Sequence, residues 1–252
     1  MAYMPPTGKT EVVTSYIWET FNKHWNKSSL VSNPPYVRIT QGTFIVQINH
    51  SIKDNFAIDG EFGYTSSEAA SGSVSDGLSD FRLGLSYKIH DQLDSLNNSY
   101  LPSYGIRAGL IAHGDYEINQ PFSAGDGGSG VEASLFFDSF LSGGWSYGGD
   151  LGYRYFSTIP DELFYGISVS KSLFTKWRVS LGVNGFSNLS GFDLGQQGTQ
   201  FNQLMESRID LDLGMTYQVS PSCFIRLGIA TALSGKNTGQ KQILALSGMY
   251  HF

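Results

Sequence analysis

Four charged residues alternate along one short stretch in the last quarter of the chain, and alternate residues of a β-strand project from the same face. They are Glu206, Arg208, Asp210 and Asp212. Two interpretations remain open. With Arg178 and Arg226 on the expected neighbouring strands, the four side chains could set a transverse electric field that selects ions in a pore. Alternatively, they form a ladder of ion pairs that neutralises charge between adjacent strands.

Histidine and serine offer a second chemistry. A membrane-barrel enzyme of the phospholipase type carries its serine two residues from its histidine on one strand. None of the five histidines is followed by serine at that spacing. His50 directly precedes Ser51, which would place the two side chains on opposite faces. The sequence therefore predicts that the protein is not an enzyme.

Three further patterns could bind phosphate or a metal. GDGGSG at 125–130 lacks both the GK[ST] ending of a phosphate loop and the ligand spacing of a calcium loop. TGKT at 7–10 follows no strand, and Cys223 is the single cysteine, which excludes a disulfide within the chain and a cysteine-based zinc site. We expect a flexible surface loop at 125–130, no cofactor and no metal.

The composition narrows the class of protein. Charged residues make up 15% of the 252 residues, below the roughly 25% of ordinary soluble domains. Aromatic residues reach 14%, and the net charge of −6 argues against nucleic acid as a partner. No run of 18 apolar residues exists, but strands of a membrane barrel need only alternate apolar positions.

Alternation of apolar and polar residues recurs from end to end, as expected for β-strands. Arg38 and Gln47 fall on opposite phases of the second segment, which predicts a β-bulge near Gln41–Gly42. Segments with helical spacing are missing from the pattern. The twelve alternating segments lie near 11–22, 37–50, 55–65, 80–89, 103–113, 130–140, 144–156, 162–172, 176–187, 204–219, 223–233 and 242–252.

The connections between these segments also alternate in character. Short turns such as LFT and SPS alternate with mostly longer connections rich in Gly, Ser, Asn and Gln. Outer-membrane barrels have short periplasmic turns and longer external loops. An even number of strands also places both termini at one rim, so we expect both in the periplasm.

The charge content of the two strand faces indicates which face contacts water. One phase is nearly uncharged on most strands; exposed to water, it would form an apolar patch far larger than soluble monomers show. The other phase collects charges of both signs, including Asp59 and Glu132. An inverted barrel, with lipid outside and polar side chains inside, accommodates both faces. Candidates for lining the pore and setting its selectivity are Glu61, Arg82, Arg107, Asp150, Arg154, Arg178, Glu206, Arg208, Asp210, Asp212 and Arg226.

The last segment carries a second signal of this class. Leu244, Leu246, Gly248, Tyr250 and Phe252 share one phase, and Phe252 ends the sequence. This pattern resembles the terminal strand that the outer-membrane assembly machinery reads, so we expect that machinery to be a partner during biogenesis.

Several stretches resemble one family of outer-membrane barrels, named for the meta-pathway of phenol degradation. GLSDFRLGLSYKI is similar to its "GLGDLxLGLxYxL" strand, and GGSGVEASLFFDSF to its central "GxGxxD" strand. SYGGDLGYRYFSTIPDELFYGISVSKSL resembles its "ANAELGYRxR…PDExxYGLxLGY" hairpin. The resemblance spans most of the chain. It implies a small outer-membrane channel for aromatic or other hydrophobic compounds, without assigning that role to particular residues.

We therefore predict an all-β protein: a transmembrane, antiparallel, up-and-down β-barrel of about 12 strands. It forms a single domain over 1–252, with a flexible segment at 1–10, in a bacterial outer membrane. We expect passive passage of small molecules, with membrane lipid and the solute as partners. The alternative is a closed barrel that acts as a binding or scaffold protein through its external loops.

Overall fold

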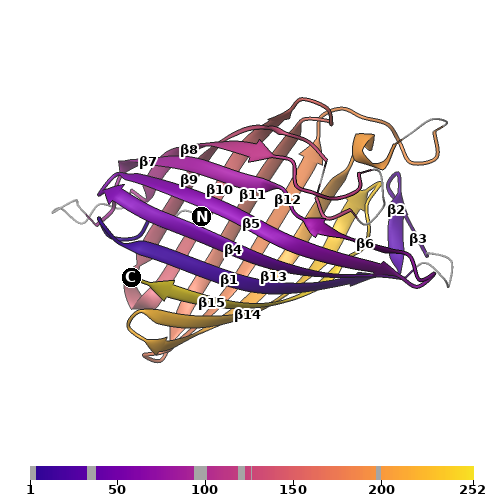
Figure 1. The fold of residues 1–252 in the computed structure, drawn as a ribbon. Helices are drawn as coiled ribbons and strands as arrows, with labels where there is room; N and C mark the ends of the chain where they lie inside the picture. The colour runs from indigo at the N-terminus through magenta and orange to yellow at the C-terminus, as the bar shows by residue number, and fades with distance from the viewer. Residues whose placement is uncertain (1–3, 33–37, 94–100, 119–122, 126, 197–199) are drawn as a thin grey trace.

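In the computed structural model, twelve long antiparallel strands form a closed barrel (Figure 1). The structure describes residues 4–32, 38–93, 101–118, 123–125, 127–196 and 200–252. The barrel strands are β1 (Thr10–Phe21), β4 (Ile39–Lys53), β5 (Phe56–Ala69), β7 (Phe81–His90), β8 (Ser103–Ala112), β9 (Gly130–Leu141), β10 (Trp145–Phe156), β11 (Glu162–Leu173), β12 (Trp177–Asn188), β13 (Ser207–Ser220), β14 (Cys223–Lys236) and β15 (Gln242–His251). All twelve strands expected from the alternation are confirmed.

The barrel closes between its first and last strands. β1 pairs with β4 on one side and with β15 on the other, so that Val13 lies opposite both Gln47 and Met249. Every strand of the barrel thus has two hydrogen-bonded neighbours, which removes the sheet edges. The backbone N–H of Phe252 donates to the carbonyl of Thr10 at 2.9 Å. The start of β1 and the end of β15 therefore share one rim, on the left in Figure 1.

Shorter strands lie at the rim opposite the termini. β2 (Lys23–Asn26) and β3 (Ser29–Ser32) form a hairpin between β1 and β4. β6 (Val74–Leu78) pairs with the far end of β5. Two short 3₁₀ turns complete the described elements: η2 (Phe201–Gln203) lies at this rim before β13, and η1 (Ser142–Gly144) lies in the turn between β9 and β10 at the rim with the termini. The rim with β2, β3 and β6 carries most of the longer loops. The rim with the termini carries the tight turns and one longer connection, between His90 of β7 and Ser103 of β8.

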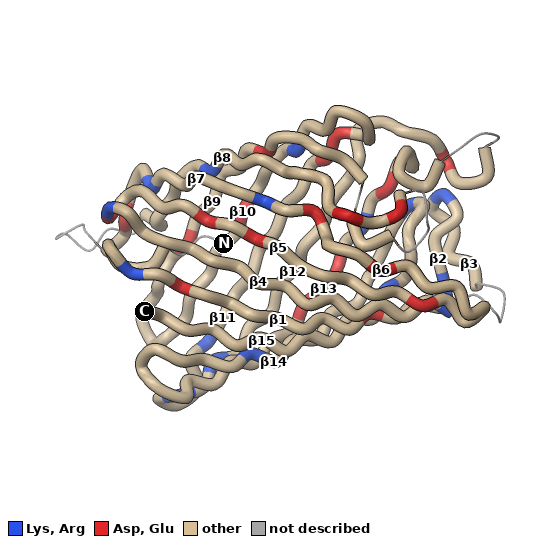
Figure 2. Tube along the Cα trace, in the orientation of Figure 1, with Lys and Arg blue, Asp and Glu red and all other residues tan. Residues whose placement is uncertain are grey.

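The apolar phase faces outward. Along β7, Leu85, Tyr87 and Ile89 are 51%, 45% and 53% exposed, whereas Ser86 between them is 8% exposed. Of the described residues, the clustered buried apolar core comprises Met4, Ala57 and Phe136 alone, too small to be the dry centre of a soluble barrel. Uncharged residues make up most of the wall (Figure 2). The inverted arrangement predicted from the sequence is confirmed.

One local prediction is wrong. β4 pairs with β1 without interruption from Ile39 to His50, so there is no bulge at Gln41–Gly42. Arg38 precedes the strand, and its Nε donates to the hydroxyl of Thr20 at 3.2 Å. The irregularity of β4 instead lies between Ser51 and Lys53, beside the turn to β5. Arg38 therefore needs no change of phase, because it lies at the rim.

No helix among the described residues is long and apolar enough to span a membrane.

Candidate functional site

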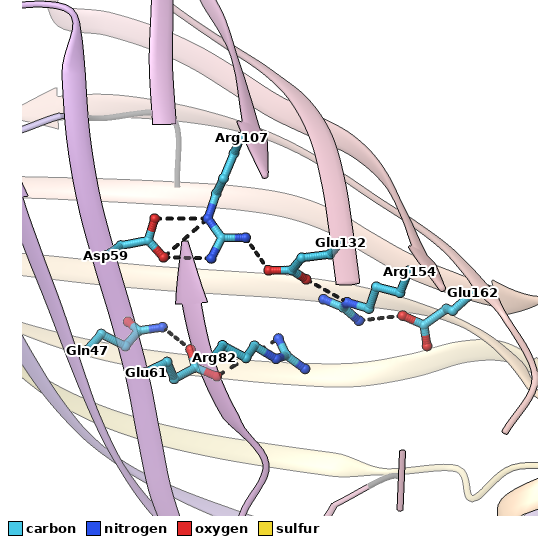
Figure 3. A network of polar contacts seen from close by, with 8 residues as sticks. All are labelled: Gln47, Asp59, Glu61, Arg82, Arg107, Glu132, Arg154 and Glu162. Carbon is cyan, nitrogen blue, oxygen red and sulfur yellow. Dashed lines mark hydrogen bonds and ion pairs between the residues drawn. The ribbon is translucent and has the colours of Figure 1, made fainter. Parts of the chain in front are cut away.

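A chain of alternating charges crosses the inner face of the wall from β5 to β11. We call it the polar belt (Figure 3); its members are Asp59 on β5, Arg107 on β8, Glu132 on β9, Arg154 on β10 and Glu162 on β11. Each arginine lies between two carboxylates, and Glu132 is shared by both arginines. Because each charge has an opposite neighbour, the belt can lie in the interior without isolated ions.

The contacts within the belt have the geometry of charge-assisted hydrogen bonds. Arg107 donates from Nε and Nη2 to Asp59, with Nη2 2.6 Å from Oδ2, and from Nη1 to Glu132. Arg154 donates from Nε to Glu132 at 3.0 Å and from Nη1 to Glu162. The Glu132 side chain is only 3% exposed, so this carboxylate depends on its two arginines in place of water.

A glycine permits the longest step of the belt. Arg107 and Asp59 lie on strands that do not pair, because β7 runs between β5 and β8. The guanidinium of Arg107 crosses β7 directly over Gly84, where an added Cβ would overlap the Nη2, Cζ and Nε atoms. Gly84 thus supplies the space in which the belt bridges two strands.

A second, smaller group adjoins the belt on β4, β5 and β7. Gln47 Nε2 donates to Glu61 Oε2 at 2.5 Å, and Arg82 Nη1 lies 3.9 Å from Glu61 Oε1. The Nε of Arg82 is buried without a protein hydrogen-bond partner. Two of the sequence candidates, Glu61 and Arg82, therefore face each other across adjacent strands.

Another part of the wall carries the alternating charged run from Glu206 to Asp212. Arg208 Nε lies 2.8 Å from Asp210 on the same strand, and Arg226 Nη2 of β14 lies 2.9 Å from Asp212. Both contacts pair opposite charges, but only the Arg226–Asp212 contact joins adjacent strands, as the ladder interpretation expects. Whether the run also contributes a transverse field stays a prediction.

Two candidates lie apart from these pairs. Arg178 is opposite Thr216 at the tight-turn end of β12, where it is exposed, and no ion pair joins it to a described residue. Glu206 lies just before β13, and its backbone carbonyl accepts a hydrogen bond from the Asn188 N–H at 2.8 Å. The remaining candidate, Asp150, is opposite Phe136 and Gly166 on the inner face.

A cavity of about 220 Å³ lies against the polar belt. Its charged lining comprises five carboxylates and three guanidiniums, an excess of two negative charges; they are Glu11, Asp59, Glu61, Glu132, Asp150, Arg82, Arg107 and Arg154. Apolar side chains also line the cavity, among them Met4, Val13, Phe136 and Phe164, together with uncharged polar side chains such as Gln47. The guanidinium of Arg154 lies 4.2 Å from the ring centre of Phe164, so aromatic and charged groups are in direct contact.

The loops at the rim opposite the termini are tied together at Asn237, which is 4% exposed. Its Nδ2 donates to Asp193 Oδ1 at 3.1 Å and to the Met205 carbonyl at 3.0 Å. Its Oδ1 accepts from the backbone N–H of Lys27 at 3.0 Å. One side chain thereby joins the β2–β3 hairpin, the loop before β13 and the turn after β14.

Asp80 holds a second loop at this rim. Its Oδ1 accepts from the Tyr116 hydroxyl at 2.6 Å and from the Gly114 N–H at 3.1 Å. The same Tyr116 hydroxyl oxygen accepts from the Gly127 N–H at 2.6 Å. In this loop the carbonyl of Ser123 accepts from Gln41 Nε2 at 3.4 Å. The loop after β8 therefore reaches across to β4. The loop includes part of the 125–130 stretch, for which the sequence predicts a flexible surface loop, and Gly127 of that stretch is hydrogen-bonded to Tyr116.

Two histidines have polar partners close to the rim with the termini. His50 Nδ1 lies 2.9 Å from the Thr10 hydroxyl, and His251 Nε2 lies 2.8 Å from Glu11 Oε2. Within the described ranges, no group of three His, Cys, Asp or Glu side chains could hold a metal ion.

Sequence reasoning places several belt residues on the charged phase but misses their connections. Asp59 and Glu132 belong to that phase, yet nothing local shows that each accepts from an arginine on another strand. Glu162 is the first residue of β11, where alternation gives the weakest guide to orientation. The sequence feature that indicates its inward orientation is its position two residues from Phe164, on the same face of β11.

Comparison with known proteins identifies the family of this chain. The model of the family described as "Putative MetA-pathway of phenol degradation" matches residues 13–246. The chain belongs to this family. No curated protein matches the chain. The resemblance found in the sequence is thus confirmed for this member of the phenol-degradation family.

Solved outer-membrane barrels share the fold. The COG4313 outer membrane channel from Pseudomonas putida F1 aligns with a TM-score of 0.79 and 14% identity, covering 98% of this chain and 97% of that chain. The KdgM porin aligns with a TM-score of 0.53 and 10% identity, covering 95% and 99%. The translocator domain of the autotransporter NalP from Neisseria meningitidis gives 0.52 and 14%, covering 98% and 90%. At these identities the likeness shows the outer-membrane barrel fold.

Proposed function

We propose that this member of the phenol-degradation family is a passive outer-membrane channel whose solute path runs past the polar belt. The observation that carries the proposal is the belt itself: alternating charges line a cavity inside a closed barrel with an apolar exterior. A twelve-stranded barrel is wide enough for a narrow channel once side chains enter it. Paired charges then give the solute hydrogen-bonding groups without a strong net barrier.

The proposed solutes are small aromatic or other moderately hydrophobic molecules. The family description refers to phenol degradation, and the cavity sets the rings of Phe136 and Phe164 beside guanidiniums and carboxylates. A planar ring can pack on such side chains while a hydroxyl group reaches the belt. No catalytic role is part of the proposal.

The proposed orientation places the tight-turn rim and both termini in the periplasm. Outer-membrane barrels have their longer loops outside the cell, and those loops lie at the rim with β2, β3 and β6. Leu246 and Tyr250 of the last strand face outward, 54% and 47% exposed, and Phe252 is 63% exposed. This apolar row is the surface that we propose the assembly machinery recognises.

Electrical recording tests the proposal. Purified protein inserted into a planar bilayer should give stable unitary conductance, with a preference for cations because the cavity lining has an excess of two negative charges. Liposome swelling with uncharged solutes of increasing size should show a sharp upper limit. Folded protein that is inserted into the bilayer and shows no conductance would contradict a channel.

A scaffold role is the second candidate, and the Asn237 contacts favour it. An outer surface that joins three loop segments through one buried side chain presents a fixed shape to a partner. A sealed barrel in electrical recordings, together with binding of a partner that the Asn237→Gly variant loses, would support this role over the channel.

A further inference from the structure

The three guanidiniums that line the cavity differ in how many of their donors are in use. Arg107 donates from Nε, Nη1 and Nη2, and Arg154 donates from Nε and Nη1. Among the described residues, no hydrogen bond holds the guanidinium of Arg82, and its Nε is buried without a protein partner. Its ion pair with Glu61 spans 3.9 Å between Nη1 and Oε1, which is beyond hydrogen-bond range. Arg82 is therefore the guanidinium whose Nη groups remain available to a solute.

Glu61 is held on one side and open on the other. Its Oε2 accepts from Gln47 Nε2 at 2.5 Å, and its Oε1 faces Arg82 across the paired strands β5 and β7 (Figure 3). The side chains of Glu61 and Arg82 are 27% and 28% exposed, and both line the cavity. A single oxygen atom can bridge two polar groups that are separated by a gap of this kind.

A neutral hydroxyl group satisfies both sides of this gap. Its oxygen accepts from Arg82 Nη1, and its hydrogen is donated to Glu61 Oε1. A carboxylate only accepts, so it meets the charge of Glu61, and an ammonium only donates, so it meets the charge of Arg82. A hydrocarbon leaves both charged groups without a partner, which costs binding free energy. The gap therefore favours a hydroxyl group over all three.

The rest of the cavity favours an aromatic body on that hydroxyl group. Phe136 and Phe164 line the same cavity as Arg82 and Glu61, and aromatic rings pack favourably against one another. At neutral pH a phenolic hydroxyl keeps its proton. A hydroxyl on an aromatic ring therefore enters the gap as a neutral group that both donates and accepts.

We propose that Arg82 and Glu61 form a hydroxyl-selective subsite in the solute path, in which a neutral hydroxyl group bridges Arg82 Nη1 and Glu61 Oε1. Gln47 positions Glu61 for this contact. The subsite lies beside the polar belt, whose arginines already have two carboxylates each. The inference rests on the proposed channel function and adds the two residues that discriminate among solutes.

Binding of three probes to the unmodified protein tests the selectivity. The probes are phenol, toluene, which replaces the hydroxyl by a methyl group, and benzoate, which replaces it by a carboxylate. Dissociation constants are measured by NMR titration of the folded protein in detergent micelles, followed on the arginine Nε–H resonances. Each affinity is expressed relative to the partition of that probe into protein-free micelles, so that the apolar contribution common to site and micelle cancels. The relative affinity for phenol should exceed that for toluene and that for benzoate by roughly tenfold, as hydrogen bonds to charged groups imply.

Substitutions on each side of the gap assign the preference to this pair. Arg82→Gln removes the donor and Glu61→Gln removes the charge of the acceptor, so each should reduce the preference for phenol over toluene by roughly tenfold. Arg38→Gln is the matched control, because it removes a guanidinium that lies at the rim beside Thr20 and outside the cavity lining. This control should leave the preference unchanged.

Benzoate separates a bridged hydroxyl from simple anion binding at Arg82. Glu61→Gln removes the negative charge that faces a carboxylate, so it should strengthen benzoate binding while it weakens phenol binding. Arg82→Gln should weaken the binding of both probes. Changes of equal sign for phenol and benzoate in Glu61→Gln would contradict the bridge.

The outcomes separate the subsite from the channel. Equal relative affinities of the unmodified protein for phenol and toluene overturn the subsite, whether or not the variants fold, and so does a preference that survives in both Arg82→Gln and Glu61→Gln. Selective phenol binding to a folded protein that never conducts in planar bilayers supports the subsite and contradicts the channel. Conductance without a preference for phenol supports the channel and overturns the subsite.

Discussion

Replacement of Glu132 by glutamine tests whether the polar belt determines both the stability and the ion preference of the barrel. The carboxylate receives hydrogen bonds from Arg107 and Arg154, and its side chain is 3% exposed. Glutamine keeps the size of the side chain and one accepting oxygen but removes the charge. Each guanidinium retains one carboxylate, Asp59 or Glu162, so neither cation becomes isolated.

The magnitude follows from these contacts. Hydrogen bonds to charged groups contribute about 1.5–3 kcal/mol, against about 0.5–1.5 kcal/mol for neutral pairs. Because glutamine can accept from only one of the two guanidiniums, one of these bonds is lost and the other is weakened. This should lower the free energy of unfolding by ~2 kcal/mol, which is less than the ~3–5 kcal/mol for stranding a buried charge. With a slope of ~4 kcal/mol per M in guanidinium chloride, the midpoint of unfolding by this denaturant should fall by ~0.5 M. The charge excess of the cavity lining falls from two negative charges, five carboxylates against three guanidiniums, to one.

Unfolding in detergent micelles and reversal potentials in planar bilayers provide the assays. Glu132→Gln should lower the unfolding midpoint and reduce cation preference together. Glu68→Gln makes the same chemical change at an exposed position of β5 and should alter neither quantity. An unchanged midpoint and unchanged reversal potential in Glu132→Gln would refute the belt as a structural and electrostatic element of the channel.

The remaining predictions concern the space above Gly84, the loops that Asn237 joins and the response of these loops to pH. Gly84→Ala should displace Arg107 from Asp59 and lower the unfolding midpoint. Gly182→Ala is the control, because this inward position has room for a Cβ at ordinary contact distances, and it should leave the midpoint unchanged. Equal midpoints in the two variants would contradict the placement of the Arg107 guanidinium over Gly84 of β7. Asn237→Gly should make the loops that Asn237 joins cleavable by added protease while the barrel stays folded. Resistance equal to that of the unmodified protein would argue against the Asn237 connections. Hydrogen bonds from Asn237 and Lys236 lower the pKa of Asp193 below its ordinary value. A lowered pKa stabilises the folded loop above the ordinary aspartate pKa, and this contribution disappears as the pH falls through the lowered value. Amide hydrogen exchange around Asp193 should therefore increase relative to the Asp193→Asn variant only under strongly acidic conditions, and an increase near neutral pH would contradict the assignment.

The strands and their faces were accessible from the sequence because period-two alternation is a local property. The contrast between Ser86 and its neighbours Leu85 and Tyr87 needs no knowledge of the partner strands. The expected bulge at Gln41–Gly42 was wrong because Arg38 lies outside its strand, and local alternation does not locate a strand end.

The connections of the belt depend on the arrangement of the whole barrel. Arg107 reaches Asp59 across an intervening strand, which requires both the register of three strands and the free space over Gly84. The position of Met4 has a similar origin, since residues 4–9 have no alternation to interpret. Their path is set by the hydrogen bonds that Gly8 and Lys9 make with Ser51, which is distant in the sequence.

The inverted orientation of the wall is the claim on which the channel depends, and the environment of each residue along β7 tests it most directly. Single cysteines at 82, 83, 85, 86, 87, 88 and 89 in a Cys223→Ser background are labelled with an environment-sensitive fluorophore in lipid vesicles. The account predicts that quenchers attached to lipid chains act on labels at 83, 85, 87 and 89, and that only a water-soluble quencher reaches 82, 86 and 88. Lipid quenching at the even positions, or equal quenching at all seven, would contradict it.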